Sequence, residues 1–192
     1  MRLVIGVSGA SGAPYAARML SFLRDHGAEL GIETHLIFTK TGRLVWTDEV
    51  GEEPASYGFP MWNPGDMTAP FASGSAGFDA MAVVPCSAGQ LARISQGMST
   101  DLVGRAADVM LKERKKLVLV LRESPYSLVH LRNMVAVTEA GAVILPASPS
   151  FYSGPKTLEQ LLDTVTARVF DQLGVSNSLM PRWQGRHAGG QP

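Results

Sequence analysis

The sequence has a single cysteine, Cys86, among its 192 residues. One thiol cannot form an internal disulfide, so we expect a protein of a reducing compartment, the cytoplasm. An excess of charge of one sign is also missing, because 17 Lys and Arg residues balance 17 Asp and Glu residues. A neutral chain lacks the basic footprint that binds nucleic acid or an anionic membrane, so neither partner is expected.

Long apolar runs are absent as well, since no stretch approaches the roughly 18–20 apolar residues that cross a bilayer. The first residues pass through a short apolar run into glycines, which favours a first strand over a signal peptide. With 45% hydrophobic and 18% charged residues, the chain is typical of a globular protein with a sizeable core. We expect one domain at residues 1–175, followed by a tail at 176–192 that is rich in Pro, Arg and Gly.

Short apolar runs alternate along the chain with segments of helical periodicity. Strands are expected at residues 3–7, 34–38, 80–84, 117–121 and 142–145. Helices are expected at residues 13–25, 41–48, 88–95, 101–113, 128–140 and 157–173. Continuous apolar strands between helices favour a parallel sheet that is covered on both faces. The predicted fold class is therefore α/β, a doubly wound, Rossmann-like parallel sheet in three layers.

Residues 52–75 follow neither periodicity and contain four prolines. We therefore predict a long loop there. A structureless loop of that length inside a compact domain is usually a functional or an assembly element.

Polar residues follow the expected strands at the point where each strand ends. The carboxyl ends of parallel strands share one edge of the sheet, and ligands of doubly wound folds bind at that edge. The five polar clusters are residues 8–12, 39–40, 86–87, 122–123 and 148–152. They predict a binding site along this edge.

Three glycines lie between the first strand and the first helix, spaced G-x-x-G-x-x-G: Gly6, Gly9 and Gly12. This spacing matches neither the dinucleotide fingerprint nor the P-loop, and Thr39-Lys40 stands where an NAD-binding fold carries an acid, so NAD is disfavoured. Small residues before a helix still expose backbone N–H groups at its positive end, where a phosphate binds. A tight turn without a ligand is the alternative, but the hydroxyls of Ser8 and Ser11 favour the ligand.

Several segments, occurring together and in order, resemble the UbiX-type flavin prenyltransferases, a family of flavodoxin-like FMN-binding proteins. The segments are residues 5–13, 72–75, 85–87, 105–109, 111–114, 120–125, 141–146, 151–152 and 181–183. The resemblance runs nearly from end to end of the chain.

The resemblance implies a prenyltransferase that joins the dimethylallyl group of dimethylallyl phosphate to N5 and C6 of reduced FMN. The product, prenylated FMN, is the cofactor of a UbiD-type decarboxylase. A homo-oligomer, usually a dodecamer, is also implied, with sites at subunit interfaces where the tail at 176–192 is partly ordered. No metal is expected, because the sequence has neither paired aspartates nor a His, Cys and Asp cluster with metal-ligand spacing.

The resemblance also implies a role for individual residues. Glu123, Glu49 and Ser11 are the expected catalytic residues, with Glu123 as general acid and base and Glu49 contributed across a subunit interface. The expected FMN contacts are Gly9, Ala10, Ser11, Thr39, Ser87 and Arg122. The expected donor-phosphate contacts are Lys112, Arg122, Tyr152 and Arg168. Fixed cations and a hydroxyl stabilise the charge that develops on phosphate when an allylic C–O bond breaks.

Most of these residues also have a purely structural interpretation. Glu123 alternatively forms a surface ion pair with Arg122, and Ser11 alternatively caps a helix. Arg105 is either a phosphate or interface arginine or one half of an interhelical pair. Trp183 either covers the site or packs at an interface.

Two other functions remain open. FMN-dependent decarboxylases of the cysteine-decarboxylase type share the fold but usually carry Pro-Ala-Ser-Ala-Asn after the strand, where this chain has Pro-Cys-Ser-Ala-Gly at 85–89. A non-catalytic flavin carrier explains the glycine turn but not the joint presence of the four residues Lys112, Glu123, Tyr152 and Arg168. Cys86 is expected to be a small buried residue rather than a nucleophile.

Overall fold

The computed structural model of the protein describes residues 1–185. Its strands are β1 (Arg2–Val7), β2 (Glu33–Phe38), β3 (Met61–Trp62), β4 (Ala80–Cys86), β5 (Lys116–Leu121) and β6 (Val143–Pro146). Its α-helices are α1 (Ala13–His26), α2 (Lys40–Glu49), α3 (Ala88–Ser95), α4 (Leu102–Lys112), α5 (Leu128–Glu139) and α6 (Leu158–Leu173). Three short 3₁₀ turns are η1 (Pro54–Tyr57), η2 (Pro70–Ala72) and η3 (Gly74–Ala76).

The strands form one parallel sheet in the order β3-β2-β1-β4-β5-β6. Without the two-residue β3, the five longer strands have the 2-1-3-4-5 order of flavodoxin-like folds. The order reverses between β1 and β4, and this switch point is where ligands of such sheets bind. The predicted doubly wound α/β fold is confirmed.

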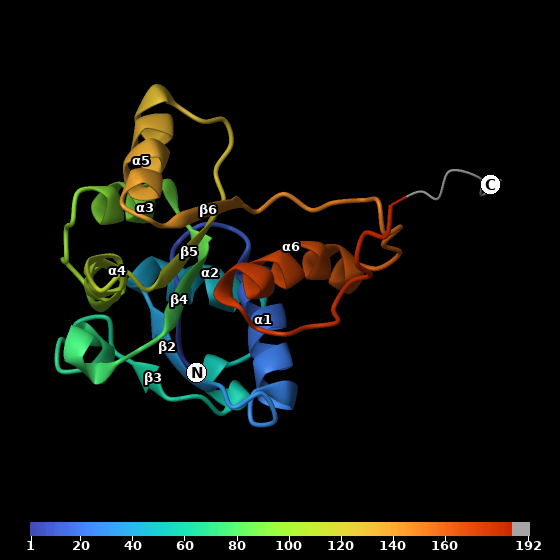
Figure 1. Ribbon diagram of the computed structural model, residues 1–192, viewed down its shortest axis with the longest axis horizontal. Coiled ribbons are helices and arrows are strands. Elements are labelled where there is room, and N and C mark those ends of the chain that lie inside the picture. The colour runs from blue at the N-terminus through green and yellow to red at the C-terminus, as the bar shows by residue number, and fades with distance from the viewer. Residues whose placement is uncertain (186–192) are drawn as a thin grey trace.

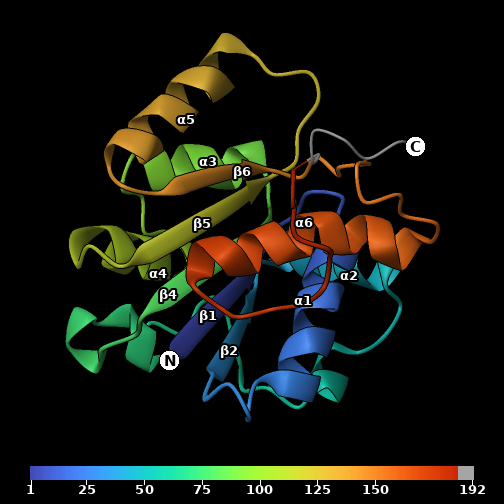
Figure 2. The same ribbon diagram turned by 45° about the vertical axis from the view of Figure 1, so that its right-hand side comes forward.

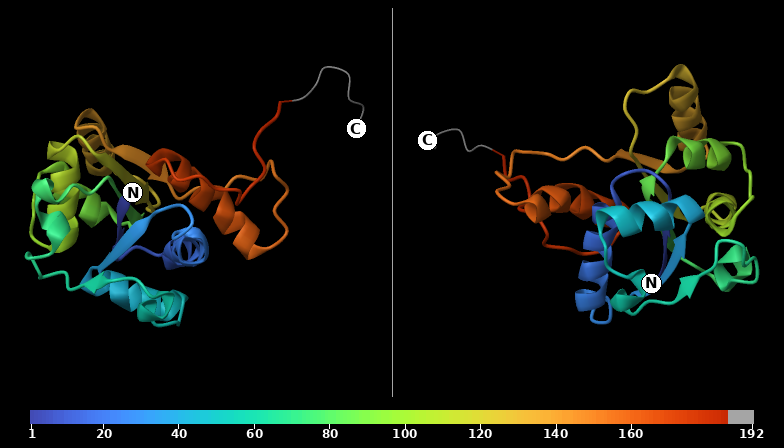
Figure 3. Two further views of the ribbon diagram at one scale, coloured as in Figure 1. Left: turned by 60° about the horizontal axis from the view of Figure 1, so that its bottom comes forward. Right: turned by 180° about the vertical axis from the view of Figure 1, so that it is seen from behind.

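Each face of the sheet carries its own apolar core. Alternate residues of β1 point to opposite faces, so that Leu3 and Ile5 join one cluster while Val4 joins the other. Helices α1 and α6 cover the first face, and α3 and α4 cover the second (Figures 1 and 2). Helix α5 packs on α3 beside the edge strand β6 (Figure 3). The sheet is therefore the middle of three layers, as the sequence predicts.

The prediction of a structureless loop at residues 52–75 is wrong. β3 extends the sheet by pairing with β2, and Trp62 of β3 donates its indole N–H to Nδ1 of buried His35, 3.0 Å away. Phe71 and Phe78 pack against the same histidine. A two-residue strand is too short to show a period, which is why the sequence pattern missed it.

Candidate active site

The carboxyl ends of β1 and β4 are joined through Ser8. Its hydroxyl donates to the carbonyl of Pro85 at 2.9 Å and accepts the backbone N–H of Ser87 at 2.8 Å, and the side chain is buried. Because both hydrogen bonds are internal, Ser8 holds the two strand ends together. The expectation that its hydroxyl serves a ligand is wrong.

The glycine turn between β1 and α1 depends on close backbone approach. A Cβ atom on Gly9 would lie 2.3 Å from the Oγ1 atom of Thr41, so only glycine fits there. Gly12 has φ +119°, a left-handed conformation that L side chains rarely adopt. The turn therefore brings the Gly9 backbone against the start of α2, within reach of the polar residues that follow β2.

Glu49, at the end of α2, occupies the N-terminus of α1. Its Oε2 atom accepts the N–H groups of Gly12 and Ala13 at 2.8 and 2.9 Å. Partial burial works to raise the pKa of the Glu49 carboxyl. The Ser11 hydroxyl, the two N–H groups and the positive charge of Arg122 outweigh that effect and hold the pKa below its usual value.

Glu49 changes two expectations about this turn. The anion at the positive end of α1 is a carboxylate, so the N–H groups of Gly12 and Ala13 are not available to the predicted phosphate. The carboxylate also comes from the same chain, whereas the resemblance implied a partner subunit. It reaches the turn because α2 ends beside the start of α1, a packing that the sequence pattern does not reveal.

A cavity of about 540 Å³ opens beyond the end of β2 and suits an anion better. Its lining includes Thr39, Lys40, Thr41 and Arg93. The Nε atom of Arg93 is buried and has no hydrogen-bond partner within residues 1–185, while one of its Nη atoms donates to Gln90. A buried N–H without a partner is costly. The cavity therefore presents the positive charges of Lys40 and Arg93 to an incoming anion, and the one carboxylate on its lining, Asp101, accepts the N–H of Gly104.

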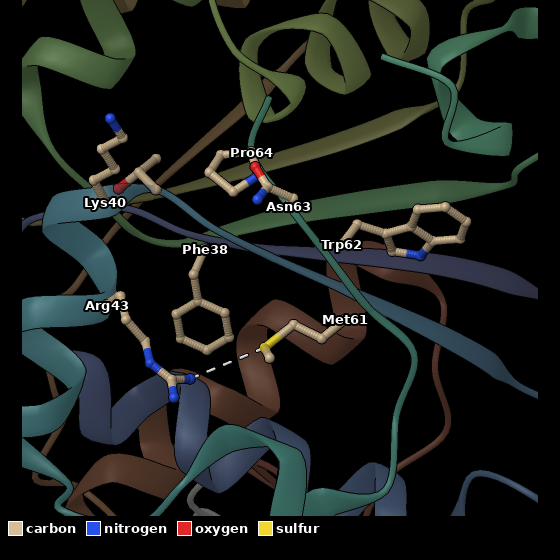
Figure 4. Close-up of a pocket in the computed structure, with 8 residues that line it drawn as sticks. Phe38, Lys40, Arg43, Met61, Trp62, Asn63 and Pro64 are labelled. Atoms are coloured by element: carbon tan, nitrogen blue, oxygen red, sulfur yellow. Dashed lines mark hydrogen bonds between the residues drawn. The ribbon is translucent and has the colours of Figure 1, made fainter. Parts of the chain in front are cut away.

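A second cavity, of about 530 Å³, adjoins the first and shares Thr39 and Lys40 with it (Figure 4). The ring of Phe38 and the side chain of Met61 give it apolar walls, and the guanidinium of Arg43 points toward the sulfur of Met61. Lys40 belongs to the polar cluster 39–40 that the sequence analysis placed at this edge. Arg93 did not stand out in the sequence, and its only signal was its position on α3, the helix that directly follows β4.

Arg122 and Glu123 follow β5 and line a cavity of about 360 Å³ together with Ser148. One carboxylate oxygen of Glu123 accepts the backbone N–H of Ser124 at 3.0 Å. No ion pair joins Glu123 to Arg122 in the part of the chain that the structure describes. The interpretation of Glu123 as one half of a surface ion pair with Arg122 is therefore not supported. The second carboxylate oxygen of Glu123 accepts no backbone N–H of this turn.

The other predicted FMN contacts lie at the same edge. The Thr39 hydroxyl caps α2 by accepting the N–H of Gly42 at 2.9 Å, and the Ser87 hydroxyl caps α3 by accepting that of Gln90 at 3.2 Å. A hydroxyl that accepts a capping bond keeps its own O–H for another acceptor. Both side chains can therefore cap a helix and donate to a ligand.

Arg168 of α6 lies beside β6, whereas Tyr152 lies on the connection between β6 and α6. Arg168 lines a cavity of about 380 Å³ that also includes Ser148, next to the cavity of Glu123. The connection from β6 to α6 then runs away from the sheet (Figure 1). Tyr152, on this connection, packs edge-on against Trp183 with ring centroids 5.7 Å apart. Of the predicted cluster 148–152, Ser148 therefore lies at the sheet edge while Tyr152 meets the tail.

Lys112 lies at the opposite edge of the sheet. It ends α4, just before β5 begins, and pairs with Glu113. The six residues of β5 span about 17 Å, and Arg122 and Glu123 stand beyond their far end. Within one chain, the structure does not bring Lys112 to the other predicted donor-phosphate contacts.

Two further residues have structural roles. Arg105 donates to the carbonyl of Ala72 at 3.0 Å and pairs with Asp108 of its own helix at 2.9 Å. Burial raises the pKa of the Cys86 thiol to about 12, so the thiol stays protonated at neutral pH. Cys86 is buried, as the sequence analysis predicts.

Among residues 1–185, no helix is long and apolar enough to cross a bilayer. The same residues contain no group of three or more His, Cys, Asp or Glu side chains that could hold a metal ion.

Comparisons with known proteins show which family this chain resembles in sequence and structure. The family model described as Flavoprotein matches residues 1–170. The flavin prenyltransferase UbiX of Thermoplasma acidophilum is 41% identical over 186 residues, which cover 95% of this chain and 100% of that protein. The crystal structure of AnUbiX (PadA1) in complex with FMN and dimethylallyl pyrophosphate has a TM-score of 0.91 and 42% identity, covering 97% of this chain and 98% of that one. A dodecameric FMN-dependent UbiX-like decarboxylase from Escherichia coli O157:H7 has a TM-score of 0.91 and 41% identity, covering 96% and 100%.

Proposed function

The chain belongs to the UbiX-like flavin prenyltransferases of the flavoprotein family, and we propose that it transfers the dimethylallyl group of dimethylallyl phosphate to N5 and C6 of reduced FMN. The position of Glu49 is the observation that links this function to particular residues. Its carboxylate sits with Ser11 at the switch point of the sheet and is held ionised beside Arg122.

Electrostatics decide how FMN lies at this edge. The carboxylate of Glu49 repels a phosphate at the N-terminus of α1, whereas Lys40 and Arg93 attract one beyond β2. We place the FMN phosphate in the cavity of about 540 Å³, where Lys40 and Arg93 supply positive charge. The isoalloxazine ring then extends past the Gly9 turn toward Ser87 and Arg122, the contacts expected from the resemblance.

The transfer breaks one bond to phosphate and makes two bonds to the flavin. The N5–C1′ bond forms while the C1′–O bond breaks, phosphate leaves with the electron pair, and N5 gives up the proton that Glu123 passes to the phosphate. Closing the fourth ring joins C6 to C3′, so C6 loses a proton and C2′ gains one. Arg122 and Arg168 stabilise the charge that develops on phosphate, and Glu123 protonates the leaving phosphate and accepts the C6 proton.

The complete donor site needs a second subunit. Lys112 stands at the far edge of its own sheet, so it reaches a phosphate near Arg122 only from another copy of the chain. Apolar side chains of α5 support assembly, since Leu128, Val129 and Val135 are each more than half exposed in one chain. We propose a homo-oligomer, a dodecamer as in the E. coli O157:H7 relative, with each site shared between subunits.

Two consequences follow for the enzyme in the cell. The reaction needs a reducing environment that supplies reduced FMN, which agrees with a cytoplasmic protein. We also propose that prenylated FMN passes to a UbiD-type decarboxylase, because a cofactor made on one protein must be released to the enzyme that uses it.

The alternatives are weaker for specific reasons. A cysteine-type decarboxylase needs the Asn that this chain replaces with Gly89 after β4. A flavin carrier has no use for Glu123 and Arg168, two charged residues beside adjoining cavities.

Donor binding separates the enzyme from the carrier. We expect the FMN-loaded protein to bind dimethylallyl phosphate saturably in calorimetry without divalent metal. Arg168→Ala should weaken binding about tenfold, because a charged hydrogen bond to phosphate is lost. Dimethylallyl alcohol, which lacks the phosphate, is the matched control and should not compete. A loaded protein that takes up no donor, as either mono- or diphosphate, would favour the carrier.

A further inference from the structure

We infer that Asp171 is a positioning residue that orients Arg168 for the donor phosphate and couples it to Arg182 in the tail. This inference rests on the proposed function, because it takes Arg168 to be a phosphate contact. It concerns Asp171, which neither the sequence pattern nor the resemblance singled out, and Arg182, to which the sequence analysis assigned no role.

The carboxylate of Asp171 holds two arginines at once. Its Oδ2 atom accepts from Nη1 of Arg168 at 2.8 Å and from Nη1 of Arg182 at 2.7 Å. Its other oxygen accepts from the side-chain amide of Asn177 at 3.2 Å. The side chain of Asp171 is only 16% exposed, against 58% for Arg168 and 49% for Arg182. The carboxylate is thus the fixed centre, and the guanidinium groups project from it.

The path of the chain after α6 brings Arg182 to this carboxylate. Gly174 ends α6 with φ +82°, and buried Val175 anchors the reversal. The side-chain amide of Asn177 then donates to the carbonyl of Ala167, and the backbone carbonyl of Asn177 accepts from Nη2 of Arg182. The tail therefore runs back along α6 (Figure 1), which places Trp183 against Tyr152.

Charge explains what this cluster can do for a phosphate. Two guanidinium groups and one carboxylate leave a net charge of about +1 beside the cavity of Arg168. A guanidinium has five N–H donors, so Arg168 keeps donors for an anion while Asp171 fixes its orientation. The hydrogen bond from Arg182, partly offset by burial, holds the pKa of Asp171 below its usual value, with Asn177 and Arg168 adding to the effect. The carboxylate therefore stays ionised near neutral pH.

The inference predicts a specific kinetic change. Asp171→Asn keeps the size of the side chain but removes its charge, so Arg168 loses its orientation. We expect kcat/KM for dimethylallyl phosphate to fall about fivefold, the size of an ion pair near the surface, with KM raised and kcat lowered because Arg168 contacts the phosphate before and during transfer. Asp171→Glu should restore part of the affinity. Glu159→Gln is the matched control, because it removes an exposed carboxylate from the same helix.

A second readout does not depend on catalysis. Trypsin cleaves after arginine, so the rate of cleavage between Arg182 and Trp183 in the FMN-loaded protein reports whether the tail is held. We expect Asp171→Asn to be cut several-fold faster than the wild type and Glu159→Gln to be cut at the wild-type rate. If Asp171→Asn were cleaved at the wild-type rate, or if its KM were unchanged, the proposed coupling of Arg168 to Arg182 through Asp171 would be overturned. A wild type that transfers no prenyl group would overturn the proposed function, while the cleavage rates would still test the link between Asp171 and the tail.

Discussion

Glu123→Gln is expected to slow prenyl transfer about 10²- to 10⁴-fold while reduced FMN still binds. A positioned acid or base contributes a rate factor of about this size, and glutamine can neither donate the proton to phosphate nor accept the proton from C6. Glutamine can still accept the Ser124 N–H through its amide oxygen, so the turn after β5 should keep its shape. Single-turnover assays under anaerobic conditions would measure the effect on chemistry directly.

The control for this substitution is Glu139→Gln, because Glu139 is an exposed carboxylate at the end of α5, away from the strand ends. It should transfer the prenyl group at the wild-type rate. A Glu123→Gln variant that also matched the wild type would remove Glu123 from the chemistry and leave Glu49 as the acid-base candidate.

Mixing two inactive variants is expected to restore activity. Lys112→Ala and Glu123→Gln should each be nearly inactive alone, because each removes one group from every site. Lys112 reaches a site only from a second subunit, so a mixed oligomer contains some sites with both residues intact. If subunits mix at random in equal amounts, about a quarter of the sites are complete and should recover about a quarter of the wild-type activity.

The mixing experiment needs oligomers that contain both variants. The two variants should therefore be co-expressed with different tags and purified through both tags. A mixture of Glu123→Gln with Glu49→Gln is the comparison, because the Glu49 carboxylate lies at the Gly12 turn of its own chain. If Glu49 and Glu123 act from one subunit, that pair should not complement. A Lys112 and Glu123 pair that stayed inactive in confirmed mixed oligomers would contradict the shared site.

The sequence predicted the fold more completely than the site. The five longer strands were legible as apolar runs, and the helix ends at Gly141 and Gly174 both adopt positive φ, as expected for glycines after helices. β3 was missed because two residues carry no period. The aromatic cluster around His35 that holds it depends on contacts between distant segments.

Position along the sheet was predictable, but the direction of single side chains was not. The pattern placed Ser8 and Ser11 in the same turn, yet Ser8 points inward to Pro85 while Ser11 meets Glu49. Lys112 was predicted as a site residue only from the resemblance, because it ends α4 and so lies at the edge of the sheet opposite the carboxyl ends of the strands. Asp171 resembled any helix-surface acid until the returning tail brought Arg182 to it.

The central claim is that the site prenylates reduced FMN without a metal. The most direct test is anaerobic incubation of the protein with FMN, dithionite and dimethylallyl phosphate in the presence of a chelator, followed by mass spectrometry of the released flavin. The account predicts a flavin heavier by one C5 unit. Unmodified FMN from folded, flavin-loaded protein, with the diphosphate donor also tried, would contradict it.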